Sequence, residues 1–400
     1  MTLLLIGCSV SPTARPLSTA TLAIGPDIPQ LNAPGSASPL PPPVVTAPDT
    51  TAIASPLTSA GTGGGSAPAA EPTPAPVGLQ ACDDVAENGG VAATLAGGLY
   101  GFNDGPFLNA GFRSPRGLAI DSEGRLYVAD TGNLAVRRLS ADGQVETLAG
   151  GPDSTVFQEP HGIAVSPTGH VFVSDTARHA IYRIAPGGAV TLVAGGTLPG
   201  YADGPGAEAQ FDDPRGLTLD AAGNLFVADM NNHCIRKISP TGEVTTFAGS
   251  LDAGAADGLA ASARFMSPIG LTIRADGNMV VADIVAHTLR LVSPAGEVTT
   301  LTGSTLGHSD GQGASAQFAH PWAIAADARD TLFVIDGLQA TRIRRVQPDG
   351  RVTTLAGTST SGYRNGTGSE ARFFSAFGLA ANSCGRLYLT DGFCRVREVR

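Results

Sequence analysis

Four short apolar runs, separated by turn residues, recur along residues 90–400. In one copy the runs cover 216–219, 224–228, 235–238 and 244–248, and Asp, Gly, Asn and Pro occupy the breaks between them. Runs of this length that are rich in β-branched and aromatic residues predict strands, and the breaks predict turns. No sustained helical period appears in this region, so the pattern predicts an all-β structure.

The second apolar run of each copy ends in aspartate, which marks the period of the repeat. The six markers are Asp130, Asp175, Asp229, Asp283, Asp336 and Asp391, and their spacings are 45, 54, 54, 53 and 55 residues. Four antiparallel strands in about 50 residues, repeated radially, are typical of a propeller blade. The sequence therefore predicts six blades.

The sixth copy is split between the two ends of the repeat region. It stops at Arg400, before the Val-Thr-Thr-Leu-Ala-Gly segment that ends other copies, and a matching Val-Ala-Ala-Thr-Leu-Ala-Gly segment stands at 91–97. We therefore predict a ring, residues 89–400, whose last blade is closed by its own N-terminal strand.

The repeated pattern Pro-x-Gly-[Leu/Ile]-Ala…Asp…Gly-x-Leu-[Tyr/Phe]-Val-Ala-Asp…Asn…Ile-Arg resembles the NHL repeat. The resemblance covers about 310 of the 400 residues and implies a six-bladed NHL β-propeller. It says little about activity, because this scaffold serves binding modules and a few enzymes. Some copies depart from the pattern: Arg178 and Ala286 replace the Asn, and Ala376 replaces the Pro.

Residues 9–80 have a different composition from the repeats. Pro, Ala, Ser, Thr and Gly dominate, and the only charged residues are Arg15, Asp27, Asp49 and Glu71. Such a segment cannot bury enough apolar surface to offset the entropy of ordering it. We expect a disordered tether before the propeller.

The first eight residues end in Leu-Ile-Gly-Cys, which resembles the bacterial lipobox. The resemblance implies lipidation of Cys8 and a cell-envelope protein that is lipid-anchored or secreted. No Lys or Arg precedes Cys8, and the apolar stretch at 1–8 is too short for a whole signal peptide. We read it as a truncated signal whose start codon lies upstream.

A disulfide between Cys82 and Cys384 is a further expectation. Cys384 falls in the turn between the first two strands of the last blade, and Cys82 precedes the closing strand on the same side of the ring. An exported compartment permits such a bond, which would fasten the closure.

One position in each blade does not repeat, and it enters the innermost strand at the top mouth of the channel. These residues are Arg116, His161, Arg215, Ile269, Trp322 and Phe377. Two Arg, one His and two aromatic rings around one mouth suit an anionic or sugar-like ligand held by charge-assisted hydrogen bonds and stacking. The alternative is a partly wet rim that holds no ligand.

Metal chemistry has weaker support in the sequence. NHL-type amidating lyases carry metal-binding His at the mouth position of several blades, whereas this chain matches only at His161, and zinc catalysis requires three protein ligands. The loop residues His179, His233 and His287 come from three blades, so we do not expect them to share a metal. His308 and His320 flank the long loop into blade five.

Repeated polar residues are interpreted as structural. We expect each marker Asp to accept backbone N–H bonds, with a third-strand Arg as its partner: Arg137, Arg183, Arg236, Arg290 or Arg344. The Asp-Gly pairs of the inter-blade loops are read as turns rather than calcium sites, which need six or more oxygen ligands. One Phe ahead of each blade is expected to fill the gap between neighbouring blades.

The formal net charge of −10 and a pI near 5.1 argue against a nucleic-acid partner, because phosphates require a basic face. The leading hypothesis is a non-catalytic, surface-tethered module that recognises a protein or saccharide partner through the top face and needs no cofactor. The alternative is a metal-dependent lyase or lactonase that uses the central channel, and a third possibility is a purely structural assembly protein. The sequence names no ligand.

Overall fold

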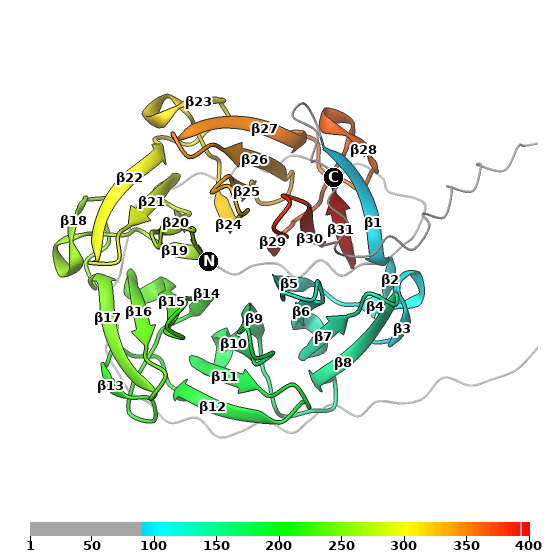
Figure 1. Ribbon diagram of the computed structural model, residues 1–400, viewed down its shortest axis with the longest axis horizontal. Coiled ribbons are helices and arrows are strands. Elements are labelled where there is room, and N and C mark those ends of the chain that lie inside the picture. The colour runs from blue at the N-terminus through cyan, green and yellow to red at the C-terminus, as the bar shows by residue number, and fades with distance from the viewer. Residues whose placement is uncertain (1–89, 393) are drawn as a thin grey trace, which may run out of the picture. The chain divides into compact units, whose positions relative to one another are not determined.

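Six antiparallel sheets stand around a common axis in the computed structural model, which describes residues 90–392 and 394–400 (Figure 1). Each sheet is one blade, and its main strands run in chain order from the axis outward, except in the last blade, whose fourth strand comes from the N-terminal end. The predicted six-bladed β-propeller is confirmed. The predicted tether at 9–80, Cys8 and Cys82 lie outside the described residues.

The first three blades use four main strands each, which follow one another from the axis outward. Blade one has β5 (Pro115–Ile120), β6 (Leu126–Asp130), β7 (Ala135–Leu139) and β8 (Gln144–Gly150). Blade two has β9 (Pro160–Val165), β10 (Val171–Asp175), β11 (Ala180–Ile184) and β12 (Val190–Gly195). Blade three has β14 (Pro214–Leu219), β15 (Leu225–Asp229), β16 (Cys234–Ile238) and β17 (Glu243–Gly249).

The other three blades follow the same order. Blade four has β19 (Pro268–Ile273), β20 (Met279–Asp283), β21 (Thr288–Val292) and β22 (Glu297–Gly303). Blade five has β24 (Pro321–Ala326), β25 (Leu332–Asp336), β26 (Arg342–Val346) and β27 (Arg351–Gly357). Blade six has β29 (Leu379–Ala381), β30 (Leu387–Asp391), β31 (Arg395–Val399) and β1 (Val91–Gly97).

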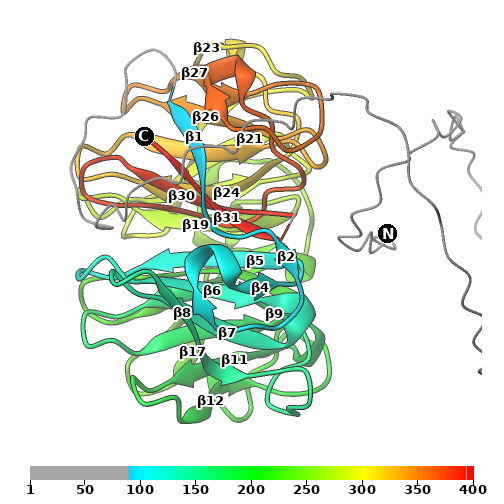
Figure 2. The same cartoon turned by 90° about the vertical axis from the view of Figure 1, so that its right-hand side faces the viewer.

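The last blade joins the two ends of the propeller. In β1, Thr94 pairs with Arg397 and Ala96 with Val396, and the backbone N–H of Val91 donates to the carbonyl of Arg400 at 2.8 Å. Seen edge-on, β1 runs beside β31, although some 300 residues separate them in the sequence (Figure 2). The predicted closure by the N-terminal strand is confirmed.

A two-residue strand extends the outer edge of every blade except the second. These strands are β3 (Gly105–Pro106), β13 (Gly204–Pro205), β18 (Gly258–Leu259), β23 (Gly311–Gln312) and β28 (Gly366–Thr367). Each belongs to the long loop that precedes its blade. Blade two lacks it because the loop before it is cut down to 151–156, which also explains the one short repeat spacing. Separately, β2 (Leu99–Tyr100) pairs in parallel with β4 (Gly111–Phe112).

Packing between blades makes the core. All five residues of β6, β15, β20, β25 and β30 are buried, because neighbouring blades cover both faces of these strands. The interblade phenylalanines are at most 2% exposed, as predicted: Phe112, Phe157, Phe211, Phe265, Phe318 and Phe373.

The marker aspartates are structural residues, as blade three illustrates. Asp229 accepts hydrogen bonds from the Asp212 backbone N–H at 2.8 Å and from Arg236 Nη1 at 2.8 Å. Arg236 Nη2 reaches Asp203 in the preceding loop at 2.6 Å, so that carboxylate fixes the arginine. Blades one, five and six repeat the marker pair at 2.9 Å, as Arg137–Asp130, Arg344–Asp336 and Arg397–Asp391.

Blade two corrects one of the predicted arginine partners. Tyr182 stands opposite Val173, where the other blades place the paired arginine, and Arg183 follows one residue later. Because side chains alternate between the faces of a strand, Arg183 lies exposed on the other face. Arg178 instead approaches Asp175, at 3.9 Å.

Candidate functional site

In four blades the mouth residue is the middle one of a Pro-x-Gly start of the innermost strand, and blades five and six depart from it with Ala323 and Ala376. Proline begins the strand in five blades, where its fixed φ and missing N–H suit a strand terminus. In blade six Ala376 replaces it, and β29 begins only at Leu379, two residues after Phe377. The innermost strand of blade six therefore begins less regularly than those of the other five blades.

Glycine after the mouth residue lets neighbouring inner strands touch. A Cβ on Gly162 would lie 1.9 Å from the carbonyl oxygen of Arg215, and one on Gly378 would lie 2.0 Å from that of Arg116. Each glycine therefore packs on the backbone of the next blade's mouth residue. This close approach brings the mouth side chains within reach of each other.

Two hydroxyl groups reinforce these contacts. Ser174 Oγ donates to the Arg215 carbonyl at 2.6 Å and accepts from the Gly162 N–H at 2.8 Å. Thr390 Oγ1 plays the same role toward the Arg116 carbonyl and Gly378. Both arginine backbones are thus fixed by the preceding blade. This role was not predicted from the sequence, although a hydroxyl residue in place of the usual Ala was its signal.

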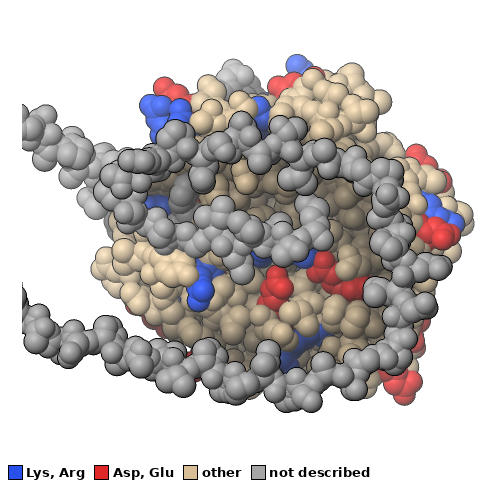
Figure 3. Space-filling view, turned by 180° about the vertical axis from the view of Figure 1, so that it is seen from behind, with Lys and Arg blue, Asp and Glu red and all other residues tan. Residues whose placement is uncertain are grey.

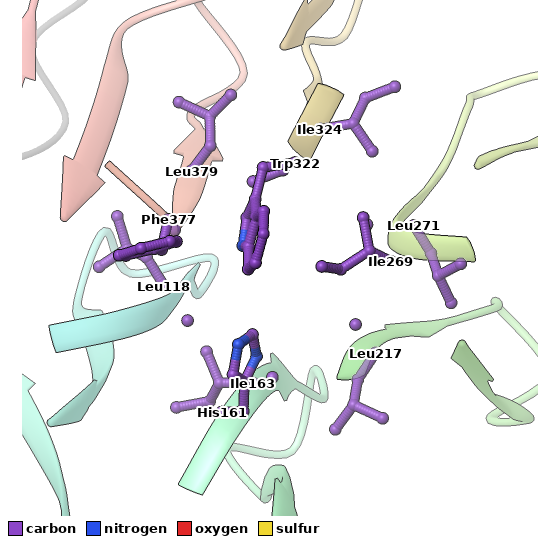
Figure 4. Close-up of a pocket in the computed structure, with 16 residues that line it drawn as sticks. Leu118, His161, Ile163, Leu217, Ile269, Leu271, Trp322, Ile324, Phe377 and Leu379 are labelled. Carbon is purple, nitrogen blue, oxygen red and sulfur yellow. The ribbon is translucent and has the colours of Figure 1, made fainter. Parts of the chain in front are cut away.

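Four of the six mouth residues form one connected group, which we call the mouth cluster: Arg116, His161, Trp322 and Phe377. The Arg116 guanidinium lies 4.7 Å from the Phe377 ring centroid, and the Phe377 and Trp322 centroids are 5.0 Å apart. Arg116 Nη1 lies 3.5 Å from His161 Nε2, whose ring is 6.3 Å from Trp322. Figure 4 shows His161 and Trp322 pointing toward each other across the channel.

The other two mouth residues stand apart from the cluster. Arg215 is engaged by Asp213 through two contacts, Nε–Oδ1 at 2.8 Å and Nη2–Oδ2 at 2.9 Å. Sequence reasoning did not assign this role to Asp213. Ile269 is 2% exposed and adds an apolar wall beside Trp322 (Figure 4).

The protonation of His161 follows from its neighbours. Arginine only donates, so His161 Nε2 accepts from Arg116 and the ring proton sits on Nδ1. Burial, followed by the positive charges of Arg215 and Arg116, holds the pKa of His161 well below its usual 6.5. His161 is therefore neutral at physiological pH.

Arg116 is a buried cation in an apolar setting. It is 7% exposed, and burial together with the charge of Arg215 lowers its pKa to about 10, against the attraction of Glu159 and Asp213. Within 90–392 and 394–400, Arg116 has no carboxylate within 4.0 Å and its Nε has no hydrogen-bond partner.

The free space in the channel is small, about 70 Å³. Ligand pockets are typically about 300–1,000 Å³, so the channel admits a small chemical group rather than a whole ligand. Its walls are inner-strand Gly, Leu and Ile residues together with Ala323, His161, Trp322 and Phe377 (Figure 4).

The loop histidines are held by separate contacts. His179 Nδ1 accepts from the Asp213 N–H at 3.2 Å, and His233 Nδ1 donates to the Met266 carbonyl at 2.6 Å. His287 and His320 do meet, with ring centroids 5.4 Å apart, which the sequence did not predict. Burial, then the charge of His287, lowers the pKa of His320. The described residues contain no group of three or more His, Cys, Asp or Glu arranged to hold a metal ion.

Of the two cysteines in the predicted disulfide, only Cys384 lies among the described residues. Cys384 and Cys394 are each disulfide-bonded, and Cys234 is a free, buried thiol. Because Cys82 lies outside the described residues, the Cys82–Cys384 bond stays a prediction.

Charged side chains are sparse on the face shown in Figure 3. Acidic and basic atoms lie among uncharged ones over its uncovered part, without a broad area of one sign. Across the described residues, no helix is both long and apolar enough to cross a membrane.

Comparison with known proteins places the repeats and the fold. The family model for the NHL repeat matches residues 112–139, 157–181 and 211–238. SUPPRESSOR OF QUENCHING 1 of Arabidopsis thaliana is 36% identical over 91 residues, which are 22% of this chain and 9% of that protein. NHL repeat-containing protein 2 of Bos taurus is 30% identical over 191 residues, 46% of this chain and 21% of that protein. The chain thus spans only a minor part of the length of the curated relatives it matches.

Solved structures share the fold at low sequence identity. An auxiliary nutrient binding protein from Bacteroides thetaiotaomicron is 18% identical with a TM-score of 0.62, covering 78% of this chain and 76% of that one. A streptogramin B lyase is 14% identical with a TM-score of 0.52, covering 78% of this chain and 98% of that one. These likenesses show the propeller fold, which binding proteins and enzymes share, and the family model shows that this chain carries NHL repeats.

Proposed function

We propose that this propeller is a non-catalytic binding module that recognises a saccharide or protein partner through the mouth of its channel. The observation that carries the proposal is the mouth cluster, in which residues that do not repeat from blade to blade nevertheless converge. A buried cation, an imidazole and two aromatic rings in edge-to-face contact supply both polar and stacking contacts to a ligand. The nutrient-binding propeller of similar fold is consistent with such a role.

The electrostatics of the mouth favour binding over metal catalysis. Arg116 and Arg215 both lower the pKa of His161, so a metal cation at that imidazole would meet the same two positive charges. The acceptor nitrogen of His161 is already taken by Arg116. The metal-dependent lyase or lactonase hypothesis would therefore need ligands other than this histidine.

We also propose that the module is presented at a bacterial cell envelope. The support is the lipobox-like Leu-Ile-Gly-Cys at 5–8, followed by the Pro-, Ala-, Ser- and Thr-rich residues 9–80. A tether of this composition would hold the propeller away from the membrane without fixing its orientation.

Binding of the full chain to a glycan array and to envelope proteins in a pull-down tests the proposal. The double variant Arg215→Ala with Trp322→Ala should lose binding, because it removes a cation and a stacking surface. A matched double variant on outer strands, Lys237→Ala with Leu192→Ala, should bind as the wild type does. Unaltered binding by the mouth variant would exclude the mouth as the site. Stoichiometric zinc or calcium that His161→Ala removes would instead support the enzyme hypothesis.

A further inference from the structure

Arg116 differs from the other buried arginines in lacking a counter-ion. Six arginines of the described segments are completely buried, and each forms an ion pair with a carboxylate: Arg137, Arg236, Arg290, Arg344, Arg386 and Arg397. Arg116, with 7% of its surface exposed, has instead the ring of Phe377 and one 3.5 Å contact with His161. A buried charge without a partner is costly, so its presence at an open mouth calls for an anion.

We propose that the mouth is a carboxylate-binding site in which the ligand supplies the counter-ion of Arg116. This inference rests on the proposed binding function and names the chemical group that the mouth recognises.

The charge balance of the mouth selects a single negative charge. Asp213 already pairs with Arg215 through two contacts. Among the described residues this leaves Arg116 as a cation without an ion pair, attracted by Glu159 and Asp213 only from beyond 4.0 Å. A monoanion matches that charge, whereas a phosphate dianion would bring a second charge into an apolar site. A planar guanidinium takes a planar carboxylate in two parallel hydrogen bonds, which favours a carboxylate at Arg116.

The shape of the channel also favours a small group next to the mouth cluster. Its free space of about 70 Å³ is lined by His161, Trp322 and Phe377 but not by Arg116 itself, and it is too small for a sugar ring or an aromatic side chain. Trp322 and Phe377, which meet edge to face with their ring centroids 5.0 Å apart, then cover the body of the ligand next to the carboxylate. A carboxylate of this kind occurs on the acidic sugars of a saccharide and at the C-terminus of a protein chain.

Tryptophan fluorescence gives a direct measurement, because Trp322 is the single tryptophan of the chain. The full chain is titrated with sodium acetate, and separately with the uncharged isostere acetamide, at an ionic strength held constant with sodium chloride. We expect acetate to produce a saturable change in the emission of Trp322 and acetamide to produce none.

Variants assign the effect to Arg116. Arg116→Gln should weaken the acetate affinity about 10-fold or more, because it removes a charge-assisted hydrogen bond. Arg264→Gln is the matched control: this arginine lies between β18 and β19, 3.4 Å from Asp252, and its loss should leave the titration unchanged. Arg116→Lys keeps the charge but not the planar fork, so it should bind acetate with reduced affinity. It also serves as the test if Arg116→Gln does not fold.

Three results would overturn the inference: equal responses to acetate and acetamide, no saturation by acetate, or wild-type acetate affinity in Arg116→Gln. If Arg116→Gln does not fold, wild-type acetate affinity in Arg116→Lys would overturn it. Partner binding on the arrays by an Arg116 variant that no longer responds to acetate would also overturn the carboxylate inference, and it would leave the proposed function intact. If the mouth double variant loses array binding while the Arg116 variants keep it, the proposed function stands and the carboxylate inference is wrong. Oligogalacturonate against its neutral galactose counterpart, and a peptide acid against its amide, then distinguish the two sources of the carboxylate.

Discussion

The buried imidazole of His161 should make the stability of the propeller depend on pH. Its pKa in the folded state is well below 6.5 because of burial and the charges of Arg215 and Arg116, whereas in the unfolded chain it is about 6.5. Below pH 6.5 the imidazole of His161 becomes protonated in the unfolded chain, whereas in the folded protein it stays neutral to a lower pH. The stabilising difference is therefore present above pH 6.5 and is lost as the pH falls.

Urea unfolding at pH 7 and pH 5 measures this effect. Between these values the wild type should lose more stability than His161→Gln, by up to about 2 kcal/mol, because His161→Gln removes the titrating group while keeping an acceptor for Arg116. His170→Gln, in the turn between β9 and β10, is the control and should follow the wild type. Equal losses in the wild type and His161→Gln would mean that His161 accepts a proton in the folded state.

At the scale of single residues, the sequence identified the mouth set because these positions break an otherwise regular repeat. It did not predict that Arg116 would contact His161, or that Asp213 would engage Arg215. Those pairings depend on how far each side chain extends across a blade boundary and which rotamer it takes. Neither property can be read from spacing along the chain.

At the scale of the strand, the glycine that follows the mouth residue in five of the six blades sets how closely the blades approach. A Cβ added to Gly216 would lie 2.3 Å from the Ile269 carbonyl oxygen, which is backbone and cannot move aside without shifting a whole inner strand. Overpacking of this kind typically costs about 1–3 kcal/mol. The repeated glycine is therefore a packing requirement between blades rather than a turn signal.

Gly216→Ala should accordingly lower the unfolding free energy by about 1–3 kcal/mol, measured by urea denaturation. Blade five provides the matched comparison, because alanine already stands at the corresponding position, as Ala323. Ala323→Gly should cost at most about 1 kcal/mol, the backbone entropy of a glycine in a strand. If Gly216→Ala were as stable as the wild type, the inner strands would have to be freer to separate than these contacts allow.

Strand number and order were predictable because the apolar runs and turn residues recur in register. The pairing in blade two was not, since a single extra residue before Arg183 moves it to the exposed face and leaves Tyr182 opposite Val173. The two-residue edge strands were also missed. Their sequences, such as Gly204–Pro205, read as turn signals, and their hydrogen bonds depend on the outer strand of the next blade.

At the scale of the whole molecule, closure of the ring depends on one strand. β1 pairs with β31 on one side and with β28 on the other, so its removal leaves both edges unpaired. Unpaired edges seek other strands, which leads to association between chains. The split repeat made this closure predictable from sequence, because only a ring requires the missing segment to stand at the opposite end.

Truncation tests how far the fold relies on that closure. A chain that begins at residue 98 lacks β1 and should unfold without a single cooperative transition, or form oligomers in sedimentation measurements, because the sixth blade is left one strand short. A chain that begins at residue 81 keeps β1 and should unfold within about 1 kcal/mol of the full chain. A synthetic peptide of residues 89–98 should restore a monomer to the shorter chain, since Thr94 and Ala96 supply the register with Arg397 and Val396. A stable, cooperative monomer that needs no peptide would show that blades one to five, with a three-stranded sixth blade, hold the ring without its N-terminal strand.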